Sequence, residues 1–203
     1  MSGSTSKPAP DSPIGAHPAG YEPDAWHEAA ARLRGSAQMA IPPSHHGRDL
    51  EHWPLRDELI LGAIKSAVPS ARAHLRQLLS GWGQAEVGPD AGVVVSELVT
   101  NSVAASAGLR LAAAPVLVWL GSDSHCLLLA VADASPRPPV RLSPGPDAER
   151  GRGLALVEAL SNRWGWHPAS ITGLRKVVWA EWRLPSGAGQ RPVTGLPDRC
   201  HAV

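Results

Sequence analysis

The feature that most constrains the fold is a pair of apolar runs, PVLVWLG and CLLLAVADA, separated only by the polar stretch SDSH. Both runs are rich in Val, Leu and Ala and have the length of strands, and the residues between them favour a turn. Two such runs joined by so short a connection predict a β-hairpin.

Segments with helical periodicity lie before the hairpin. The sequence SAVPSARAHLRQLLSGWG, residues 66–83, repeats large apolar side chains at the spacing of one helix face. Asp90 is placed to cap a second helix that runs to about Ala107. The stretch ELILGAI, from Glu58 to Ile64, indicates a short strand before both helices.

A third helix and a last strand follow the hairpin. Leu154, Val157, Leu160 and Trp164 recur at helical spacing, and the closing KVVWAEWRL alternates two sets of side chains as a strand does. The predicted order of elements is therefore β, α, α, β, β, α, β. This order favours an α+β fold, a two-layer sandwich in which a mixed β-sheet is covered on one face by about three helices.

Composition divides the chain into three parts. Residues 1–54 are rich in Pro, Gly, Ala, Ser and His and hold few large apolar side chains to offset chain entropy, so this extension is predicted to be mostly disordered. Within it, the stretch from Asp24 to Leu33 is compatible with a short helix. Residues 55–185 form the predicted domain, and residues 186–203 repeat the Pro/Gly-rich composition as a flexible tail.

Charge and cysteine content argue against several classes of protein. The formal net charge is +1, which gives no electrostatic reason to expect a nucleic-acid or membrane partner. The two cysteines, Cys126 and Cys200, lie too far apart in sequence to suggest a disulfide framework or a metal cluster, so we expect free thiols. Neither a signal core nor an apolar run of about 18 residues is present. These features predict a soluble cytoplasmic protein.

The stretch SELVTNSVAAS places a carboxylate and an amide in an otherwise apolar helix. A helical wheel of about 100° per residue puts the apolar and small residues on one stripe and Glu97 with Asn101 on another face. At four residues apart, both side-chain oxygens can point at one ligand or ion. A solvated polar face is the alternative interpretation of such a pair.

Asp133 stands at the end of an apolar strand, where a buried carboxylate would need a donor partner. The exocyclic amine of a purine is one such donor. Ser135 and the prolines after it would then form a stiff turn beside the pocket. An ordinary exit from strand to loop is the alternative, since Asp, Ser and Pro are common there.

The stretch ERGRGLALVEAL places glycines directly before a helix. Near Gly151 and Gly153, free backbone N–H groups and the positive end of the helix can receive phosphate oxygens. A flexible helix entry is the alternative. The chain has no Walker-type Gly-Lys-Ser/Thr, and these glycines follow a loop rather than a first β-strand, so neither a P-loop nor a dinucleotide fingerprint is satisfied.

In order and spacing, the motifs SELVTNSVAAS, VADASPRPP and GRGLALVEALSNRWG resemble the nucleotide-binding boxes of the histidine-kinase-like (GHKL) ATPase superfamily. The resemblance covers about residues 56–184 and implies the Bergerat-type ATP-binding fold. Within the superfamily the chain looks most similar to the small ATP-binding regulators related to anti-sigma-factor serine kinases. That closer likeness depends on the closing KVVWAEW, the short loop between the second and third motifs, and the absence of another domain.

The resemblance implies a role for each motif, with ATP and Mg²⁺ as cofactors. Asn101 would be a ligand of Mg²⁺, and Glu97 would orient a water on the metal or act as general base on the incoming hydroxyl. Asp133 would accept a hydrogen bond from the adenine amine, and Ser135 would support its loop. Four residues would cover the phosphates: Gly151, Arg152, Gly153 and Leu154.

Two departures from the family pattern concern polar contacts. Relatives often have a Thr after Lys176 that helps to bind adenine through water, and this chain has Val177. Some relatives have a basic residue or His just after the helix amide, and this chain has Val103, Ala104 and Ala105. These departures favour nucleotide binding over phosphoryl transfer.

Three functions are compatible with these patterns. The first is a MgATP-dependent protein-serine/threonine kinase that binds a sigma factor and phosphorylates an anti-sigma antagonist protein, with a homodimer as a compatible state. The second is a non-catalytic switch module in which bound ATP controls a surface for a protein partner. The third, a detached sensor histidine kinase domain, would need an exposed phosphoacceptor His, for which His74 is the nearest candidate. Arg72 and Arg76 form either a solvated face or a partner-docking patch.

Overall fold

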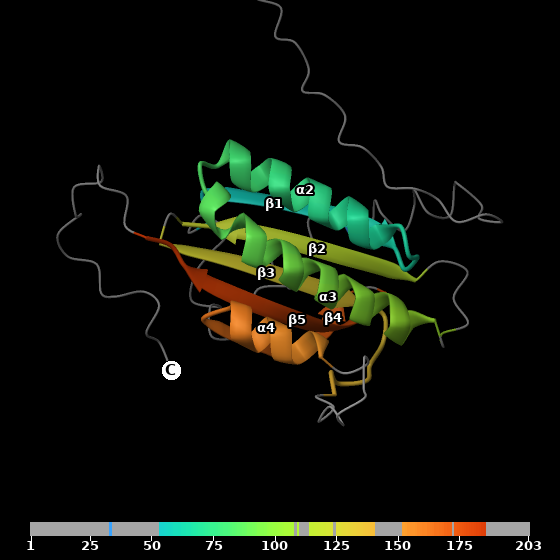
Figure 1. Cartoon of the computed structure of the whole chain (residues 1–203). Helices are drawn as coiled ribbons and strands as arrows, with labels where there is room; N and C mark the ends of the chain where they lie inside the picture. The colour runs from blue at the N-terminus through green and yellow to red at the C-terminus, as the bar shows by residue number, and fades with distance from the viewer. Residues whose placement is uncertain are drawn as a thin grey trace, which may run out of the picture.

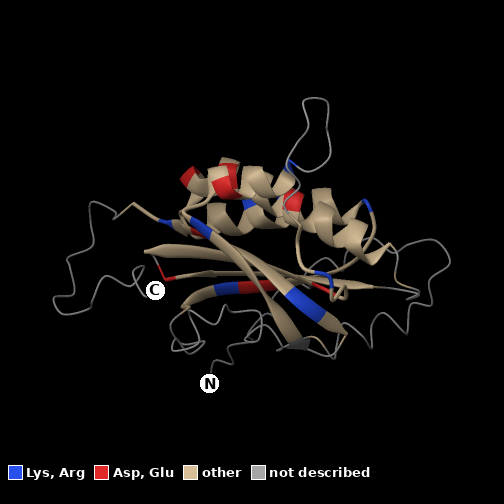
Figure 2. Ribbon diagram, turned by 90° about the horizontal axis from the view of Figure 1, so that it is seen from below, with Lys and Arg blue, Asp and Glu red and all other residues tan. Residues whose placement is uncertain are grey.

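The computed structural model shows an α+β fold with a five-stranded sheet and helices packed on it (Figure 1). The residues that it describes are 33, 53–107, 109, 114–123, 125–140, 152–171 and 173–185. The helices form a layer on one side of the sheet, and acidic and basic residues occur in both layers (Figure 2). The predicted α+β class, with helices over one face of a sheet, is confirmed.

The strands are β1 (Leu55–Gly62), β2 (Pro115–Ser122), β3 (Cys126–Asp133), β4 (Arg163–Ile171) and β5 (Leu174–Arg183). They lie in the order β1-β2-β3-β5-β4, and each neighbouring pair is antiparallel. The predicted hairpin is confirmed as β2 and β3, in which Val116 pairs with Asp133. The predicted strand at Glu58 to Ile64 is β1, which begins and ends earlier.

The prediction of a mixed sheet is wrong, because β4 was not recognised in the sequence. If a single strand followed the third helix and paired with β3, the helical crossover would make the two strands parallel. In the structure β4 lies at the edge of the sheet instead, and β5 turns back to lie between β4 and β3. Every neighbouring pair among the described strands is therefore antiparallel.

The sequence of β4, RWGWHPASI, contains both Gly and Pro, which weaken the signal of a strand. A proline is tolerated at the edge of a sheet, where one side of the strand needs no backbone donor. Gly165 is required by its neighbour: a Cβ atom at this position would lie 2.7 Å from Cζ2 of the Trp179 ring on β5. The ring of Trp179 thus fills the space that a side chain on β4 would take.

Three α-helices of the described chain cover the sheet: α2 (Ala67–Gly81), α3 (Gly88–Ser106) and α4 (Gly153–Leu160), with a short 3-10 turn, η4 (Ala85–Val87), before α3. Asp90 lies in the first turn of α3 and is not its cap, because Pro89, whose fixed φ suits a first turn, already belongs to the helix. Helix α4 ends before Trp164, because Ser161 is extended (φ −124°, ψ 155°). Trp164 belongs to β4.

The main core lies between the helices and the inner face of the sheet. The predicted stripe of α3 is confirmed, since Val95, Leu98 and Val99 are buried together with Ser102 and Ser106. Alternate residues of β3 and β5 fill the same core from the sheet. This burial fixes the rotation of α3 about its axis, and its polar face is thereby turned away from the core.

The outer face of the sheet is buried as well. Its apolar side chains on β2, β3 and β5 form a second core that includes Leu33 and Trp53 from the chain before β1. The rings of Trp53 and Trp119 meet edge-on, with their centroids 5.6 Å apart. Both faces of β2 and β3 are thus buried, as their almost continuous apolar sequences require.

Leu33 and Trp53 are described residues of the extension that is predicted to be mostly disordered. Leu33 is helical and 2% exposed, and Trp53 is 0% exposed. They are buried because the outer face of the central strands is as apolar as the inner face and gains stability from cover. Apart from Leu33, the predicted helix from Asp24 lies outside the described residues, as does the predicted tail 186–203.

Cys126, the first residue of β3, is not the free thiol that its sequence context predicts. It is disulfide-bonded, and the other cysteine of the chain lies outside the described residues. In the described part of the chain, no helix combines the length and the apolar character needed to cross a membrane.

Leu33→Ala is expected to lower the free energy of unfolding by about 2–5 kcal/mol, because removing a buried leucine leaves a cavity. Urea unfolding followed by tryptophan fluorescence measures the change. Val140→Ala is the matched control at a side chain that is 67% exposed, and it should change stability by about 0.5 kcal/mol or less. A loss at Leu33 as small as that of the control would show that Leu33 does not belong to the core.

Candidate functional site

A cavity of about 740 Å³ lies between α3, α4 and the neighbouring ends of β3 and β5. It brings together three motifs that are far apart in the sequence. The predicted site residues that line it are Glu97, Asn101, Asp133, Arg152, Gly153 and Leu154. One ligand bound in this cavity could therefore contact all three motifs.

Glu97 and Asn101 line the cavity from α3, on the helix face that the wheel predicts. Glu97 is half-buried and Asn101 is exposed. Gly153, the first residue of α4, lies against both side chains: a Cβ atom built on it would be 2.6 Å from Glu97 Oε2 and 3.5 Å from Asn101 Nδ2. The missing side chain of Gly153 thus lets the N-terminus of α4 approach the polar face of α3.

Asp133 is completely buried at the end of β3, with 0% exposure. Its Oδ1 accepts hydrogen bonds from Lys176 Nζ at 2.9 Å and from the backbone N–H of Ser135 at 2.8 Å. Within the described residues, its Oδ2 has no hydrogen-bond partner, although it is shielded from solvent. Because a buried carboxylate oxygen without a donor is costly, this atom marks a position where a donor on a ligand would be favourable.

Lys176 is the candidate site residue that the sequence analysis did not select. It pairs directly with Asp133 across β3 and β5 and is 5% exposed. Because side chains alternate along a strand, Lys176 and Val178 line the cavity, whereas Val177 packs in the second core on the outer face. The departure from the family pattern at Val177 therefore removes no side chain from this cavity. The alternation of side chains in KVVWAEW could have revealed Lys176, because Lys176 belongs to the alternate set of residues that face inward.

Of the described residues that were predicted for the site, Ser135 is not among those that line the cavity. Ser135 is 1% exposed; its N–H binds Asp133, and its Oγ accepts a hydrogen bond from the backbone N–H of Arg137 at 3.3 Å. These bonds shape the loop that follows β3. Gly151 lies outside the described residues, and the structure describes its motif from Arg152 onward.

The cavity carries charges of both signs. Arg137, Arg152 and Lys176 line it together with the two carboxylates. Arg152 directly precedes α4, where the free N–H groups and the positive end of the helix lie, and this arrangement suits phosphate oxygens. No group of three His, Cys, Asp or Glu residues in the described chain could hold a metal. A cation on Asn101 would therefore take most of its ligands from phosphate and water.

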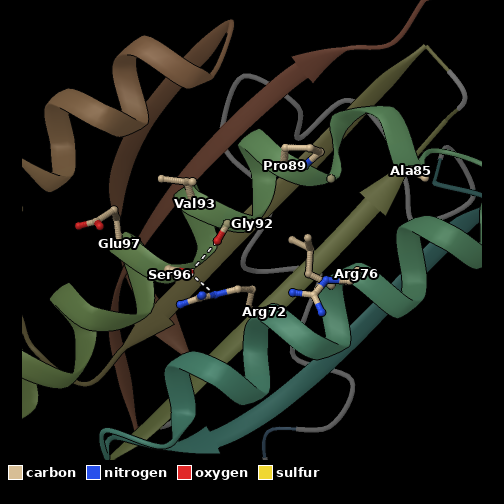
Figure 3. Close-up of a pocket in the computed structure, with 10 residues that line it drawn as sticks. Arg72, Arg76, Ala85, Pro89, Gly92, Val93, Ser96 and Glu97 are labelled. Atoms are coloured by element: carbon tan, nitrogen blue, oxygen red, sulfur yellow. Dashed lines mark hydrogen bonds between the residues drawn. The ribbon is translucent and has the colours of Figure 1, made fainter.

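A second cavity, of about 520 Å³, lies between α2 and α3, and we call it the arginine groove (Figure 3). Arg72 and Arg76 line it from α2, and Arg72 Nε donates a hydrogen bond to Ser96 Oγ on α3 at 3.0 Å. Arg76 forms no hydrogen bond or ion pair within the described chain. Glu97 lines both cavities, and its carboxylate points away from the arginines, to the side where α4 lies (Figure 3). The two arginines are exposed and border this groove.

His74 is held against the sheet. Its side chain is 16% exposed, and its Nε2 lies 2.8 Å from Asp57 Oδ1 on β1. A phosphoacceptor histidine has to be accessible to a separate catalytic site. The geometry of His74 therefore does not favour the detached histidine kinase.

A scan of the sequence against models of protein families finds none that matches, and a search of curated proteins finds no match either. The support for a function comes from the residues that line the two cavities.

Breaking the buried ion pair from one side is expected to cost more stability than removing both charges. Lys176→Met leaves the Asp133 carboxylate unpaired, so the free energy of unfolding should fall by about 3–5 kcal/mol. Combining it with Asp133→Asn should restore part of this loss, since no buried charge remains. Urea unfolding of both single variants and the double variant measures the coupling, and strictly additive losses would show that the two residues are independent.

Proposed function

We propose that this chain is an ATP-binding regulatory protein of the histidine-kinase-like (GHKL) ATPase type. In this proposal it is a MgATP-dependent protein-serine/threonine kinase that binds a sigma factor and phosphorylates an anti-sigma antagonist. The observation that carries it is the buried Asp133, which lines a cavity together with Glu97 and Asn101 and whose Oδ2 has no donor within the described residues.

The size and lining of the cavity suit a nucleotide. Pockets for small molecules have volumes of about 300–1,000 Å³, and the volume of this cavity, about 740 Å³, falls within that range. The apolar side chains of Leu98, Leu154 and Val178 line it together with Asp133. A flat base could be held by apolar contacts while its exocyclic amine donates a hydrogen bond to Asp133 Oδ2.

The region where α3 meets α4 supports the binding of phosphates. Arg152 supplies a positive charge, the first turn of α4 supplies backbone donors, and Gly153 keeps side-chain atoms out of the space beside Glu97. Asn101 is the residue that would hold Mg²⁺ through its side-chain oxygen. Bound Mg²⁺ would neutralise charge on the phosphates. The residues present are thus compatible with both cofactors.

Glu97 supports the transfer of a phosphoryl group. As general base, its carboxylate takes the proton of a serine or threonine hydroxyl on the partner while that oxygen bonds to the terminal phosphorus. The bond between the terminal phosphorus and the oxygen that bridges it to the rest of ATP breaks, and ADP leaves with this bridging oxygen. Catalysis of this kind depends mainly on positioning and charge neutralisation, which the chain supplies through Arg152 and the N-terminus of α4.

The arginine groove supports a protein partner beside this base. Arg76 carries a positive charge that no described residue neutralises, and Leu75 and Pro89 add apolar lining. An acidic segment of a partner with apolar side chains would complement this surface. Because Glu97 lines both cavities, a partner in the groove would lie next to the residue whose carboxylate points toward the nucleotide cavity.

A non-catalytic switch module is the second candidate function. Ala104 and Ala105 line the nucleotide cavity near the position where some GHKL relatives have a basic residue or His. Their methyl groups do not prevent the nucleotide from binding. They offer no additional polar group that could assist transfer of a phosphoryl group. In this function the bound nucleotide changes a partner-binding surface and no phosphoryl group moves.

ATP is expected to bind in the micromolar range, with a free energy of about −8 kcal/mol, and binding should depend on Mg²⁺. Calorimetry of the full chain with ATP, in the presence and absence of Mg²⁺, measures both. Asp133→Asn should weaken binding by about 10-fold or more, because it removes a charged acceptor. Asp90→Asn, at an exposed residue outside the cavity, is the control. A folded protein that ignores ATP at millimolar concentration would contradict the proposal.

Glu97→Gln is expected to retain ATP binding and to slow phosphorylation of the partner by about 10²- to 10⁴-fold, because it lacks the general base. Transfer from ATP labelled on its terminal phosphate to candidate antagonist proteins of the same organism measures this. Glu86→Gln, at an exposed acid on η4, is the matched control.

Two outcomes separate the functions. Label on a serine or threonine of a partner excludes the pure switch module, and unchanged transfer by Glu97→Gln removes Glu97 from the mechanism. A protein that binds ATP and labels none of the antagonists contradicts the kinase and supports the module.

A further inference from the structure

Lys176 has hydrogen-bonding capacity that the described chain leaves unused. Its side chain is 6% exposed, and its Nζ donates to Asp133 Oδ1 at 2.9 Å. An ammonium group has three N–H donors, and Asp133 is the only hydrogen-bond partner of the Lys176 ammonium within the described residues. Lys176 and Asp133 both line one cavity, and the spare donors of Lys176 therefore lie beside a carboxylate whose Oδ2 has no partner in the described chain.

We propose that Lys176 recognises the base directly. Its ammonium donates a hydrogen bond to a ring nitrogen of a 6-aminopurine, while Asp133 Oδ2 accepts a hydrogen bond from the neighbouring exocyclic amine. The inference rests on the proposed ATP binding and adds the residue that selects the base. Adenine has a ring nitrogen acceptor on each side of its amine. On the protein, the ammonium donor lies next to the carboxylate acceptor. On adenine, the ring nitrogen acceptor lies next to the amine donor, so the two patterns are complementary.

A 6-oxopurine bound in the orientation of adenine would lose the amine contact. Inosine would place a carbonyl oxygen against the carboxylate, and where Lys176 donates to the ring nitrogen N1 it would also place a ring N–H against the ammonium. Guanine could offer two N–H donors to a carboxylate, but Oδ1 of Asp133 is already engaged by Lys176 and by the N–H of Ser135. One free oxygen beside one ammonium therefore fits an amine with an adjacent ring acceptor, and the orientation of the base in the cavity decides between adenine and a 6-oxopurine.

The register of the sheet gives Lys176 this position. Lys176 faces the cavity directly opposite Asp133, whereas Val177 is 0% exposed in the second core on the outer face. The side chain beside the carboxylate is therefore a long donor that can reach the base itself. This arrangement differs from the Thr that holds a water in relatives of the GHKL type.

The test compares nucleotides on the wild-type chain by calorimetry with Mg²⁺. The nucleotides are ATP, its 1-deaza and 7-deaza analogues, each of which replaces one ring nitrogen by C–H, and inosine triphosphate. One deaza analogue should bind about 10-fold more weakly than ATP, because it loses a hydrogen bond from a charged donor. Inosine triphosphate should bind about 100-fold more weakly or worse.

The matched variant is Lys176→Met, which retains the length of the side chain and removes its donors. In this variant ATP and the sensitive deaza analogue should bind equally, whatever the absolute loss of affinity, since the contact that distinguished them is gone. Thermal unfolding verifies that the variant is folded. If it does not fold, the comparison of nucleotides on the wild-type chain decides.

Each result has a distinct meaning. Equal binding of ATP and both deaza analogues by the wild type overturns the role of Lys176 and leaves ATP binding intact. A difference between ATP and an analogue that persists in Lys176→Met overturns it as well. Failure of every adenine nucleotide to bind overturns the proposed function itself.

Discussion

The candidate site depends on the pairing of β3 with β5. The register of this pair sets Asp133 opposite Lys176 at the point where both strands reach the cavity. Strand β5 can take this place only because β4 lies outside it at the edge of the sheet. The two charged side chains are then buried together, and one carboxylate oxygen is engaged while the other has no donor within the described chain. A pairing shifted by one residue would turn Lys176 to the outer face.

Helix α3 adds the second half of the site through a division of its surface. Its apolar stripe is held in the main core, which leaves Glu97 and Asn101 on the side that borders α4. Gly153 lets α4 approach this polar face without moving the Glu97 carboxylate, from which a Cβ atom at this position would be 2.6 Å away. The packing of the apolar stripe in the core thus fixes the positions of Glu97 and Asn101, although these two side chains contribute little to that packing. Such a separation keeps the site geometry stable without occupying the cavity.

The sequence was informative where structure is determined locally. The hairpin β2–β3, the helix α2 and the buried stripe of α3 were all predicted from periodicity. The cavity also brings together Glu97, Asn101 and Asp133, which were selected from separate motifs. Strand β4 was missed because Gly165 and Pro168 are compatible with a strand only at an edge and beside a large aromatic ring.

By itself, then, the sequence determined most of the helices and strands, with β4 as the exception, and which of their faces are apolar, because both depend on the spacing of neighbouring residues. The tertiary structure alone decided that the sheet is wholly antiparallel among its described strands, that Leu33 and Trp53 cover its outer face, and that Lys176 lies beside Asp133. These properties depend on contacts between residues that are far apart in the chain. Such contacts follow from strand order and register, which the periodicity of a single segment does not contain.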